Sequence, residues 1–380
     1  MKELIKKVGQ MLCIGFEGQE CGPELRSLLK EVRPGGVIFF QRNIATGEQF
    51  RKLVADIREV LKDSRPFLAI DQEGGEVDRF RELLGPLPSA RDAAQAGLAF
   101  ELGDLAGREL AAFGLNVDFA PVLDLGSPES RSVLGTRAAG DKPQEVIQFA
   151  REFLRGLGGW NIMGCAKHFP GLGAGRKDSH FALPVIDKSE QDLWEADLKP
   201  YSFTAMRYPM IMVAHAWYPE LERALAPDSA AVRNPTPASL SPGIIQIVLR
   251  RQISHMGLIV SDDLEMGGVL EGRTIERAAV ETVRAGCEIL MVCRLAGHVE
   301  RVYTALVRET ENDSGFREQV LEAARRIQFE KDKMQSNCSQ PSISFADLNT
   351  LRSAIASLGE DVRKRTSAAG PGHAERRGGR

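Results

Sequence analysis

Short apolar runs alternate with longer amphipathic segments along most of this chain, and this alternation restricts its fold more than any other feature. The runs are five to seven residues long and rich in Val, Ile, Leu and Phe, which is typical of buried parallel strands. We predict strands at residues 11–16, 36–40, 67–71, 117–123, 163–169, 210–215, 258–262 and 288–293. We predict helices between them at residues 49–61, 98–113, 143–157, 190–206, 244–256 and 274–285.

Eight strands that alternate with helices predict an α/β protein with a (β/α)8 TIM barrel. A doubly wound open sheet has the same alternation, but no strand here is followed by a G-x-G-x-x-G turn. We expect a single barrel domain over residues 1–335 and a C-terminal helical extension at 336–366. The Gly- and Arg-rich residues 367–380 are expected to form a disordered tail.

The composition limits the partners that such a chain can have. Hydrophobic residues make up 43% and charged residues 27%, which suffices for a large core without disulfides. The net charge of −3 provides no basic field for nucleic acid or anionic lipid. The six cysteines form no CxxC pair, so we expect buried thiols and no metal. Because no signal peptide or membrane-spanning run is recognisable, we expect a cytoplasmic protein without a membrane partner. We also expect a monomer that uses no cofactor.

Polar residues lie at the ends of five predicted strands, where the active sites of barrels are built. These residues are Asp71, Asp124, the pair Lys167-His168, His215 and the pair Asp262-Asp263. A single Asp at a strand end is as often a helix cap as a catalytic group. Five polar strand ends that meet on one face of a barrel favour a functional site.

Three features indicate chemistry on a sugar. Asp262 ends its strand facing the expected pocket, where a carboxylate can attack an anomeric carbon, whereas Asp263 is expected to cap the next helix. Asp178 lies two residues before His180 after a glycine-rich loop, so its carboxylate can orient the imidazole as an acid/base. Arg79 and Arg137 follow predicted strands and can bind hydroxyl and acetamido oxygens of a neutral ligand.

At these residues the chain resembles glycoside hydrolase family three, in its β-N-acetylglucosaminidase branch. The matching motifs, in the order of the family, are Ala69-Ile-Asp-Gln-Glu-Gly-Gly with Arg79, Gly135-Thr-Arg137, Lys167-His-Phe-Pro-Gly, Asp178-Ser-His180 and Ser261-Asp-Asp-Leu. They extend over roughly residues 1–308. Lys-His-Phe-Pro-Gly followed by Asp-Ser-His is the specific part of the match.

The resemblance implies a retaining β-N-acetylhexosaminidase that removes terminal N-acetylglucosamine from short glycans. It makes Asp262 the nucleophile and His180 the acid/base, with Asp178 as the partner of the imidazole. It places Asp71, Arg79, Arg137, Lys167 and His168 on substrate-binding positions, to which we add His215 as a polar strand end. The implied substrates are muropeptides of cell-wall recycling.

The chain departs from the usual pattern of this branch at four positions, which are Glu76, Ala138, Ala139 and Leu172. None of these is a proposed catalytic residue, so the departures concern loop conformation, substrate preference and turnover. Residues 225–242, rich in Ala and Pro, are interpreted as a long loop at the barrel mouth that reshapes the leaving-group side.

Three other functions stay open at this point. A phosphorylase of the same fold would transfer the glycosyl group to phosphate. A catalytically silent sugar-binding protein would share the fold but would not need all of Asp178, His180 and Asp262. An unrelated lyase or aldolase would need a Schiff-base lysine at a strand end, for which Lys167 is the candidate.

Overall fold

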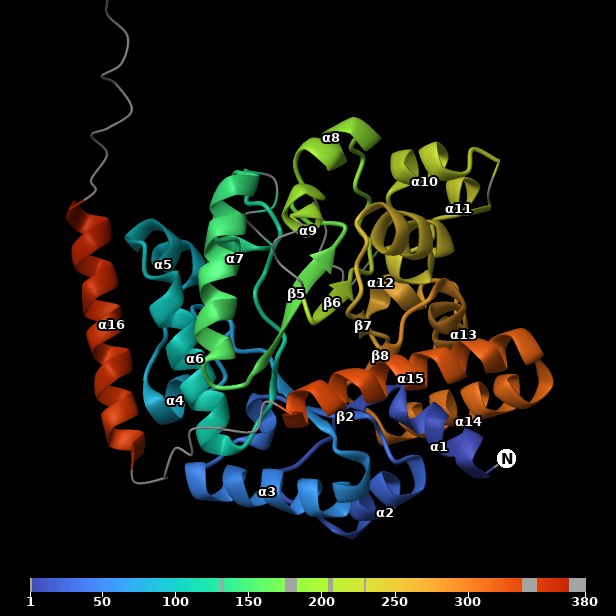
Figure 1. Cartoon of the computed structure of the whole chain (residues 1–380), viewed down its shortest axis with the longest axis horizontal. Helices are drawn as coiled ribbons and strands as arrows, with labels where there is room; N and C mark the ends of the chain where they lie inside the picture. Colours follow the sequence, from blue (N-terminus) through green and yellow to red (C-terminus); the bar gives the residue numbers. More distant parts are fainter. Residues whose placement is uncertain are drawn as a thin grey trace, which may run out of the picture.

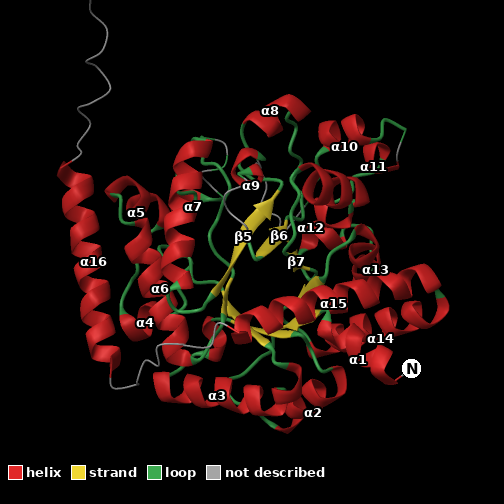
Figure 2. Cartoon of the chain, viewed as in Figure 1, coloured by secondary structure: helices red, strands yellow, loops and turns green. Residues whose placement is uncertain are grey.

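The strands of the protein form a closed parallel barrel in the order β1-β2-β3-β4-β5-β6-β7-β8. Figure 2 shows the strands in yellow, with helices around them. The computed structural model describes residues 2–128, 130, 133–174, 183–203, 208–228, 230–336 and 347–368. The strands are β1 (Leu12–Ile14), β2 (Gly36–Phe39), β3 (Phe67–Ile70), β4 (Val117–Asp118), β5 (Met163–Phe169), β6 (Met210–Val213), β7 (Leu258–Asp263) and β8 (Ile289–Val292). The predicted (β/α)8 fold class is therefore confirmed.

All eight strands lie where the apolar runs predicted them, with one marked difference in length. The predicted strand at 117–123 is reduced to β4, of two residues. Pro121 has no N–H group to donate to a ladder, so the chain leaves the regular pairing after Asp118. It returns for a single parallel bridge between Val122 and Lys167. This segment therefore still leads to the carboxyl ends of the strands.

Helices surround the barrel (Figure 1). The longer ones that connect strands or follow them are α2 (Pro23–Val32), α3 (Gly47–Val60), α6 (Ala99–Phe113), α7 (Pro143–Gly158), the π-helix η5 (Gly243–Gln252), α13 (Ile275–Ala285), α14 (Ala296–Asn312) and α15 (Ser314–Ser336). Shorter helices α4 (Arg81–Leu84), α5 (Ala90–Ala96) and α12 (Gly267–Leu270) lie in the connections, and α1 (Lys2–Gln10) precedes β1. Their apolar sides pack on the strands, as periodic amphipathic segments require.

Two connections differ from the prediction. The single helix expected at 190–206 is two short helices, α8 (Glu190–Glu195) and α9 (Lys199–Ser202). Ala196 leaves the helical region and Pro200 lies in the first turn of α9, where a proline is tolerated. Residues 225–242 are not a plain loop, because α11 (Ala230–Arg233) and the 3₁₀ turn η4 (Ala238–Leu240) follow α10 (Pro219–Leu225).

A buried lysine lies at the amino end of the barrel. Lys331 of α15 is 3% exposed and its Nζ donates to Gln10 Oε1 and to the Ser64 carbonyl, both at 2.8 Å. The same Nζ lies 5.1 Å from the ring centroid of Phe67, the first residue of β3. Burial, and then the neighbouring Arg65, lower the pKa of Lys331 to about 7.

The last described helix, α16 (Leu348–Ala368), packs against α4, α5 and α6 at one side of the molecule (Figure 1). Arg352 Nε donates to the Leu83 carbonyl at 2.9 Å, and Arg365 Nη1 donates to the Ala96 carbonyl at 3.2 Å. The helix ends two residues after the extension expected to stop at 366, and the rest of the predicted tail lies outside the described residues.

Cysteines in the described residues are free and buried, as predicted for five of the six. The sixth, Cys338, lies outside the described residues. Among the helices that the structure describes, none combines the length and the apolar character needed to cross a bilayer.

Candidate active site

A cavity of about 580 Å³ opens at the carboxyl ends of the strands. Six of the predicted site residues line it together, which are Asp71, Arg79, Arg137, Lys167, His168 and Asp262. They come from the ends of β3, β5 and β7 and from the loops after β3 and β4. The structure therefore brings these six side chains to the face on which barrel enzymes place their chemistry.

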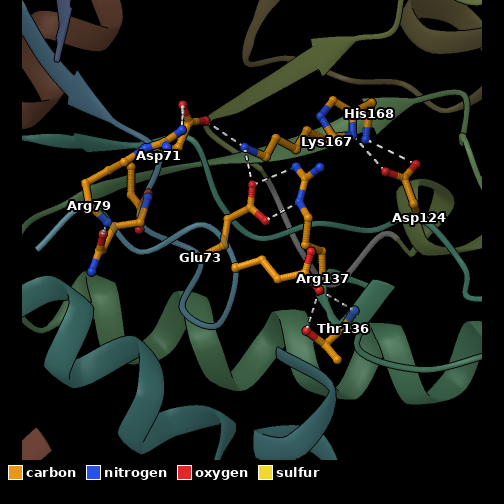
Figure 3. A network of polar contacts seen from close by, with 11 residues as sticks. Asp71, Glu73, Arg79, Asp124, Thr136, Arg137, Lys167 and His168 are labelled. Atoms are coloured by element: carbon orange, nitrogen blue, oxygen red, sulfur yellow. Dashed lines mark hydrogen bonds and ion pairs between the residues drawn. The ribbon is translucent and has the colours of Figure 1, made fainter. Parts of the chain in front are cut away.

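Lys167 lies at the centre of the polar network in this cavity (Figure 3). Its Nζ is 2.7 Å from Asp71 Oδ1 and 2.6 Å from Glu73 Oε1. Burial alone lowers the pKa of Lys167, but the two carboxylates outweigh this effect, so its pKa lies above the usual value. Lys167 is therefore a fixed cation and a hydrogen-bond donor, which does not suit a Schiff-base lysine.

Glu73 joins Lys167 to Arg137 (Figure 3). Arg137 Nε and Nη2 donate to the two oxygens of Glu73, each at 2.8 Å, in a bidentate pair. Burial raises the pKa of Glu73, but Arg137 and Lys167 outweigh it and hold the pKa well below its usual range. The guanidinium of Arg137 is thereby held at the cavity wall.

Arg79 lines the cavity, and Glu76 lies in the same loop after β3. Arg79 Nη2 lies 3.6 Å from Asp71 Oδ2, and its backbone N–H donates to Gln72 Oε1 at 2.7 Å. Glu76, one of the departures from the usual family pattern, accepts from Thr136 Oγ1 at 3.1 Å and from the Thr136 backbone N–H at 3.3 Å. The Glu76 side chain therefore ties the β3 loop to the turn that carries Arg137.

The His168 ring is in contact with the carboxylate of Asp124 (Figure 3). Its Nδ1 lies 2.7 Å from Asp124 Oδ2, and Asp124 is 0% exposed. Asp124 Oδ1 accepts the backbone N–H of Leu172 at 2.7 Å and that of His168 at 3.4 Å. The imidazole therefore reaches the cavity with one ring nitrogen already occupied.

Asp262 and Asp263 are adjacent and both line the cavity, but their contacts and pKa shifts differ. Asp262 is partly exposed in the cavity, and its Oδ1 accepts the Asp263 N–H at 2.8 Å. Burial raises the pKa of Asp262, but His168 and His215 outweigh it, so the pKa lies below its usual value. Asp263 Oδ1 accepts the backbone N–H groups of Glu265 at 3.1 Å and Cys293 at 3.3 Å. Burial, with the nearby carboxylates, raises the pKa of Asp263 to about 7.

His215 lies beneath the cavity and is not among its described lining residues. Its Nδ1 is 2.7 Å from Ser239 Oγ and its Nε2 is 3.1 Å from the Asp263 carbonyl. Burial lowers the pKa of this imidazole, although the nearby Asp262 carboxylate opposes the effect. With both ring nitrogens occupied, His215 holds the backbone at the end of β7.

The predicted dyad of Asp178 and His180 lies outside the described residues. The residues that lead to it are packed closely: a Cβ at Gly171, where φ is +131°, would lie 2.7 Å from Asp197 Cβ. Beyond the dyad, Lys188 Nζ pairs with the same Asp197 at 2.6 Å. The chain before residues 175–182 therefore packs closely against Asp197, and the chain after them forms an ion pair with the same residue.

Sequence reasoning missed several residues of the cavity. Glu73 was part of a recognised motif but had no assigned role, although positions two apart along an extended segment lie on one side. Asp124, which does not line the cavity, stands at a predicted strand end, but the sequence alone does not identify His168 as its partner. Arg42, Glu265 and Arg294 line the cavity from the ends of β2, β7 and β8, and no pattern in the sequence distinguished them from surface charges.

The other three departures from the family pattern differ in place. Leu172 lines the cavity, whereas Ala138 and Ala139 are buried and are not among its described lining residues. Among the described residues, no group of three or more His, Cys, Asp or Glu side chains is arranged to hold a metal ion.

Comparison with known proteins adds three observations. The sequence model described as "Glycosyl hydrolase family 3 N terminal domain" matches residues 3–329. A protein of Alkalilimnicola ehrlichii named "Beta-hexosaminidase" is 37% identical over 305 residues, which cover 78% of this chain and 83% of that protein. A protein of the same name from Pseudomonas aeruginosa is 36% identical over 303 residues, covering 78% and 86%.

Solved structures show the same likeness. A family 3 β-N-acetylglucosaminidase from Paenibacillus has a TM-score of 0.83 and 28% identity, over 94% of this chain and 68% of that one. A β-N-acetylhexosaminidase from Beutenbergia cavernae has a TM-score of 0.75 and 26% identity, over 87% and 98%.

Proposed function

We propose that this chain, which belongs to glycosyl hydrolase family 3, is a retaining exo-β-N-acetylglucosaminidase that removes terminal, non-reducing N-acetylglucosamine from short glycans. The chain is a glycoside hydrolase of the β-hexosaminidase type. The observation that carries the finer proposal is the cavity itself, in which the partly exposed carboxylate of Asp262 shares one wall with the network centred on Lys167.

Asp262 is the proposed nucleophile. A pKa below the usual value keeps its carboxylate ionised at neutral pH, as attack on an anomeric carbon requires. Asp263 does not suit this role, because one of its oxygens accepts two backbone N–H groups and its pKa is raised to about 7. A carboxylate nucleophile implies two displacements and therefore retention of the β configuration.

The terminal sugar is proposed to lie against Asp71, Arg79, Arg137, Lys167 and His168. These side chains are fixed by one another and by their neighbours before a ligand arrives, so little conformational entropy is lost when a hydroxyl-rich ring binds. A fixed pattern of donors and acceptors also selects the positions of the hydroxyl and acetamido groups.

His180 is proposed as the acid/base, with Asp178 as the partner of its imidazole, on the family resemblance alone. We also propose that the natural substrates are muropeptides of cell-wall recycling, that the enzyme is cytoplasmic, and that it acts as a monomer. No metal or cofactor takes part in the proposed reaction.

The substrate proposal is tested with p-nitrophenyl glycosides. The N-acetyl-β-glucosaminide should be cleaved faster than the β-glucoside, the β-xyloside and the N-acetyl-β-galactosaminide. Proton NMR should show the β-anomer as the first product, and adding phosphate should not divert product to a sugar phosphate. Preferred cleavage of the β-glucoside, a first α-anomer, or a phosphorylated product would each contradict part of the proposal.

The nucleophile is tested with Asp262→Ala, with Asp263→Ala as the matched neighbour. Asp262→Ala should lower kcat by several orders of magnitude and leave the fold intact, because covalent catalysis is lost. Asp263→Ala should change thermal stability more than kcat, since it removes the acceptor of two backbone N–H groups. The reverse pattern would move the nucleophile to Asp263.

A further inference from the structure

We propose that Asp124 is a positioning residue of the reaction, which acts by setting the protonation pattern of the His168 imidazole and by holding the start of the 172–174 segment beside it. The inference rests on the proposed function for its kinetic part only. No motif assigned a role to this side chain, and Asp124 is absent from the described lining of the cavity.

The contacts of Asp124 are those of a carboxylate used entirely as an acceptor. Oδ2 lies 2.7 Å from His168 Nδ1, and Oδ1 accepts the N–H groups of Leu172 and His168 at 2.7 and 3.4 Å. The side chain is 0% exposed, so water does not compete for these contacts. A buried acceptor with three N–H partners is satisfied only if His168 carries a proton on Nδ1.

A proton on Nδ1 determines what His168 presents to the cavity. In a neutral imidazole the other nitrogen, Nε2, is then an acceptor for a sugar hydroxyl, and in the charged form it is a donor. The opposite tautomer would place two lone pairs against each other at 2.7 Å and would turn a different group toward the ligand. Asp124 thus selects the ring state without contacting the sugar.

The second set of contacts links the same carboxylate to the chain beyond His168. The Leu172 N–H is bound by Asp124, the Gly171 carbonyl accepts from Tyr218 Oη at 2.8 Å, and the Gly173 carbonyl accepts from Ser127 Oγ at 2.7 Å. Of these three anchors, only Asp124 also bonds to the His168 ring. Ser127 therefore provides a control that loosens the same segment and leaves the imidazole untouched.

A merely structural role is the competing interpretation. Buried carboxylates that cap backbone N–H groups are common, and removing one lowers stability without changing chemistry. The two interpretations differ in what they predict for the His168 ring. If Asp124 is only a structural cap, it does not affect which ring nitrogen carries the proton. If Asp124 is a positioning residue, it determines which nitrogen is protonated.

The first test is ¹⁵N NMR of the histidine side chains in the wild-type protein without substrate. His168 is assigned by the signal lost in His168→Gln. Its Nδ1 should carry a proton, either in the neutral tautomer or in the imidazolium. A bare Nδ1 overturns the proposal, whether or not Asp124→Asn folds and whichever glycoside the enzyme cleaves.

The second test compares Asp124→Asn with Ser127→Ala. The substitution D124N keeps the size and shape of the side chain, but its new NH₂ group can turn toward Nδ1 and favour a proton on Nε2. We expect kcat/KM to fall roughly 10- to 100-fold, mainly through kcat, with a changed His168 spectrum. Ser127→Ala should leave that spectrum unchanged.

Two outcomes of this comparison would overturn the proposal. One is a D124N enzyme that keeps kcat/KM within about twofold of the wild type and an unchanged His168 spectrum. The other is an equal loss of kcat/KM in Ser127→Ala, which would place the whole effect in the 172–174 segment. In a His168→Gln background, D124N should lose most of its effect, because the ring through which it acts is gone.

Discussion

Lys167 and Lys331 lie at opposite ends of the same barrel, and both are almost completely buried, with exposed fractions of 2% and 3%. Their surroundings differ in one respect. At the carboxyl end, Lys167 Nζ lies between two carboxylates. At the amino end, Lys331 Nζ has an amide oxygen, a carbonyl oxygen and an aromatic face.

The difference in partners reverses the effect of burial on the charge. Both amines lose favourable hydration, yet the pKa of Lys167 lies above its usual value and that of Lys331 falls to about 7. Neutral acceptors bind an ammonium group but do not offset the free energy of burying a charge, whereas anionic partners do. One end of the barrel therefore maintains a charged lysine between carboxylates, and the other holds a lysine whose neutral form is favoured by burial.

The largest effect is expected for Lys167→Met. It removes the cation between Asp71 and Glu73 and a donor to the proposed sugar site. We expect kcat/KM to fall by about 10² or more and the free energy of unfolding to fall by about 3–5 kcal/mol, the usual result of leaving a buried charge without its partner. Urea unfolding and steady-state kinetics measure the two quantities. Activity within a few-fold of the wild type would remove Lys167 from the site.

A smaller effect, with a characteristic pH dependence, is expected for Lys331→Met. The pKa of Lys331 falls from 10.5 to about 7 on folding, so between these values the unfolded chain binds more protons. The folded protein is therefore most stable, with respect to this lysine, above pH 10.5, where the Lys331 amine is neutral in both states. This stability is lost as the pH falls to about 7, where the buried amine becomes protonated. The melting temperature of the wild type relative to Lys331→Met should therefore rise from pH 7 to pH 9.

The activity of Lys331→Met supplies the contrast with Lys167. At pH 7 its kcat/KM should stay within about twofold of the wild type, because the substitution lies at the amino end of the barrel. A pH-independent difference in melting temperature would show that Lys331 keeps its ordinary pKa in the folded protein. Lys167 and Lys331 would then differ only in the groups that contact their Nζ atoms and not in the direction of their pKa shifts.

The smallest effect is expected for truncation after Ala368. The removed residues, 369–380, have no apolar periodicity with which to offset the entropy of ordering. Both kcat/KM and the melting temperature should be unchanged within error. A fall of several degrees would contradict this prediction and would mean that these residues contribute to the stability of the fold.

The sequence predicted the barrel because its signal is repeated. Eight apolar runs of the right length, in a regular order, leave few other folds. The failures were local: Pro200 divided one predicted helix, and Pro121 shortened one predicted strand. In each case a single proline removes a backbone N–H donor and fixes a dihedral angle. A pattern of apolar residues does not show this local effect.

The sequence predicted those residues of the candidate site that stand at the end of a strand and line the cavity. It was less informative for residues that only contact a lining residue. Asp71, Lys167, His168 and Asp262 stand at strand ends, and all four line the cavity. Asp124 stands at one too, but its partner is 44 residues away and only the closed barrel brings them together. His215 shows the opposite case, since its place at a strand end put it beneath the cavity with both ring nitrogens occupied.

Helix α16 lies outside the stretch matched by the family, which ends at residue 329. Through Arg352 and Arg365 it binds carbonyl oxygens at the ends of α4 and α5. These two short helices follow directly on the loop that carries Asp71, Glu73 and Arg79. A local opening of α16 would therefore release the ends of two helices that follow the β3 loop in the sequence. Hydrogen exchange in α4 and α5 should then report on a segment more than 250 residues away. The stability of the two short helices after the β3 loop is in that sense adjustable from the outside of the barrel, by changes that leave every strand untouched.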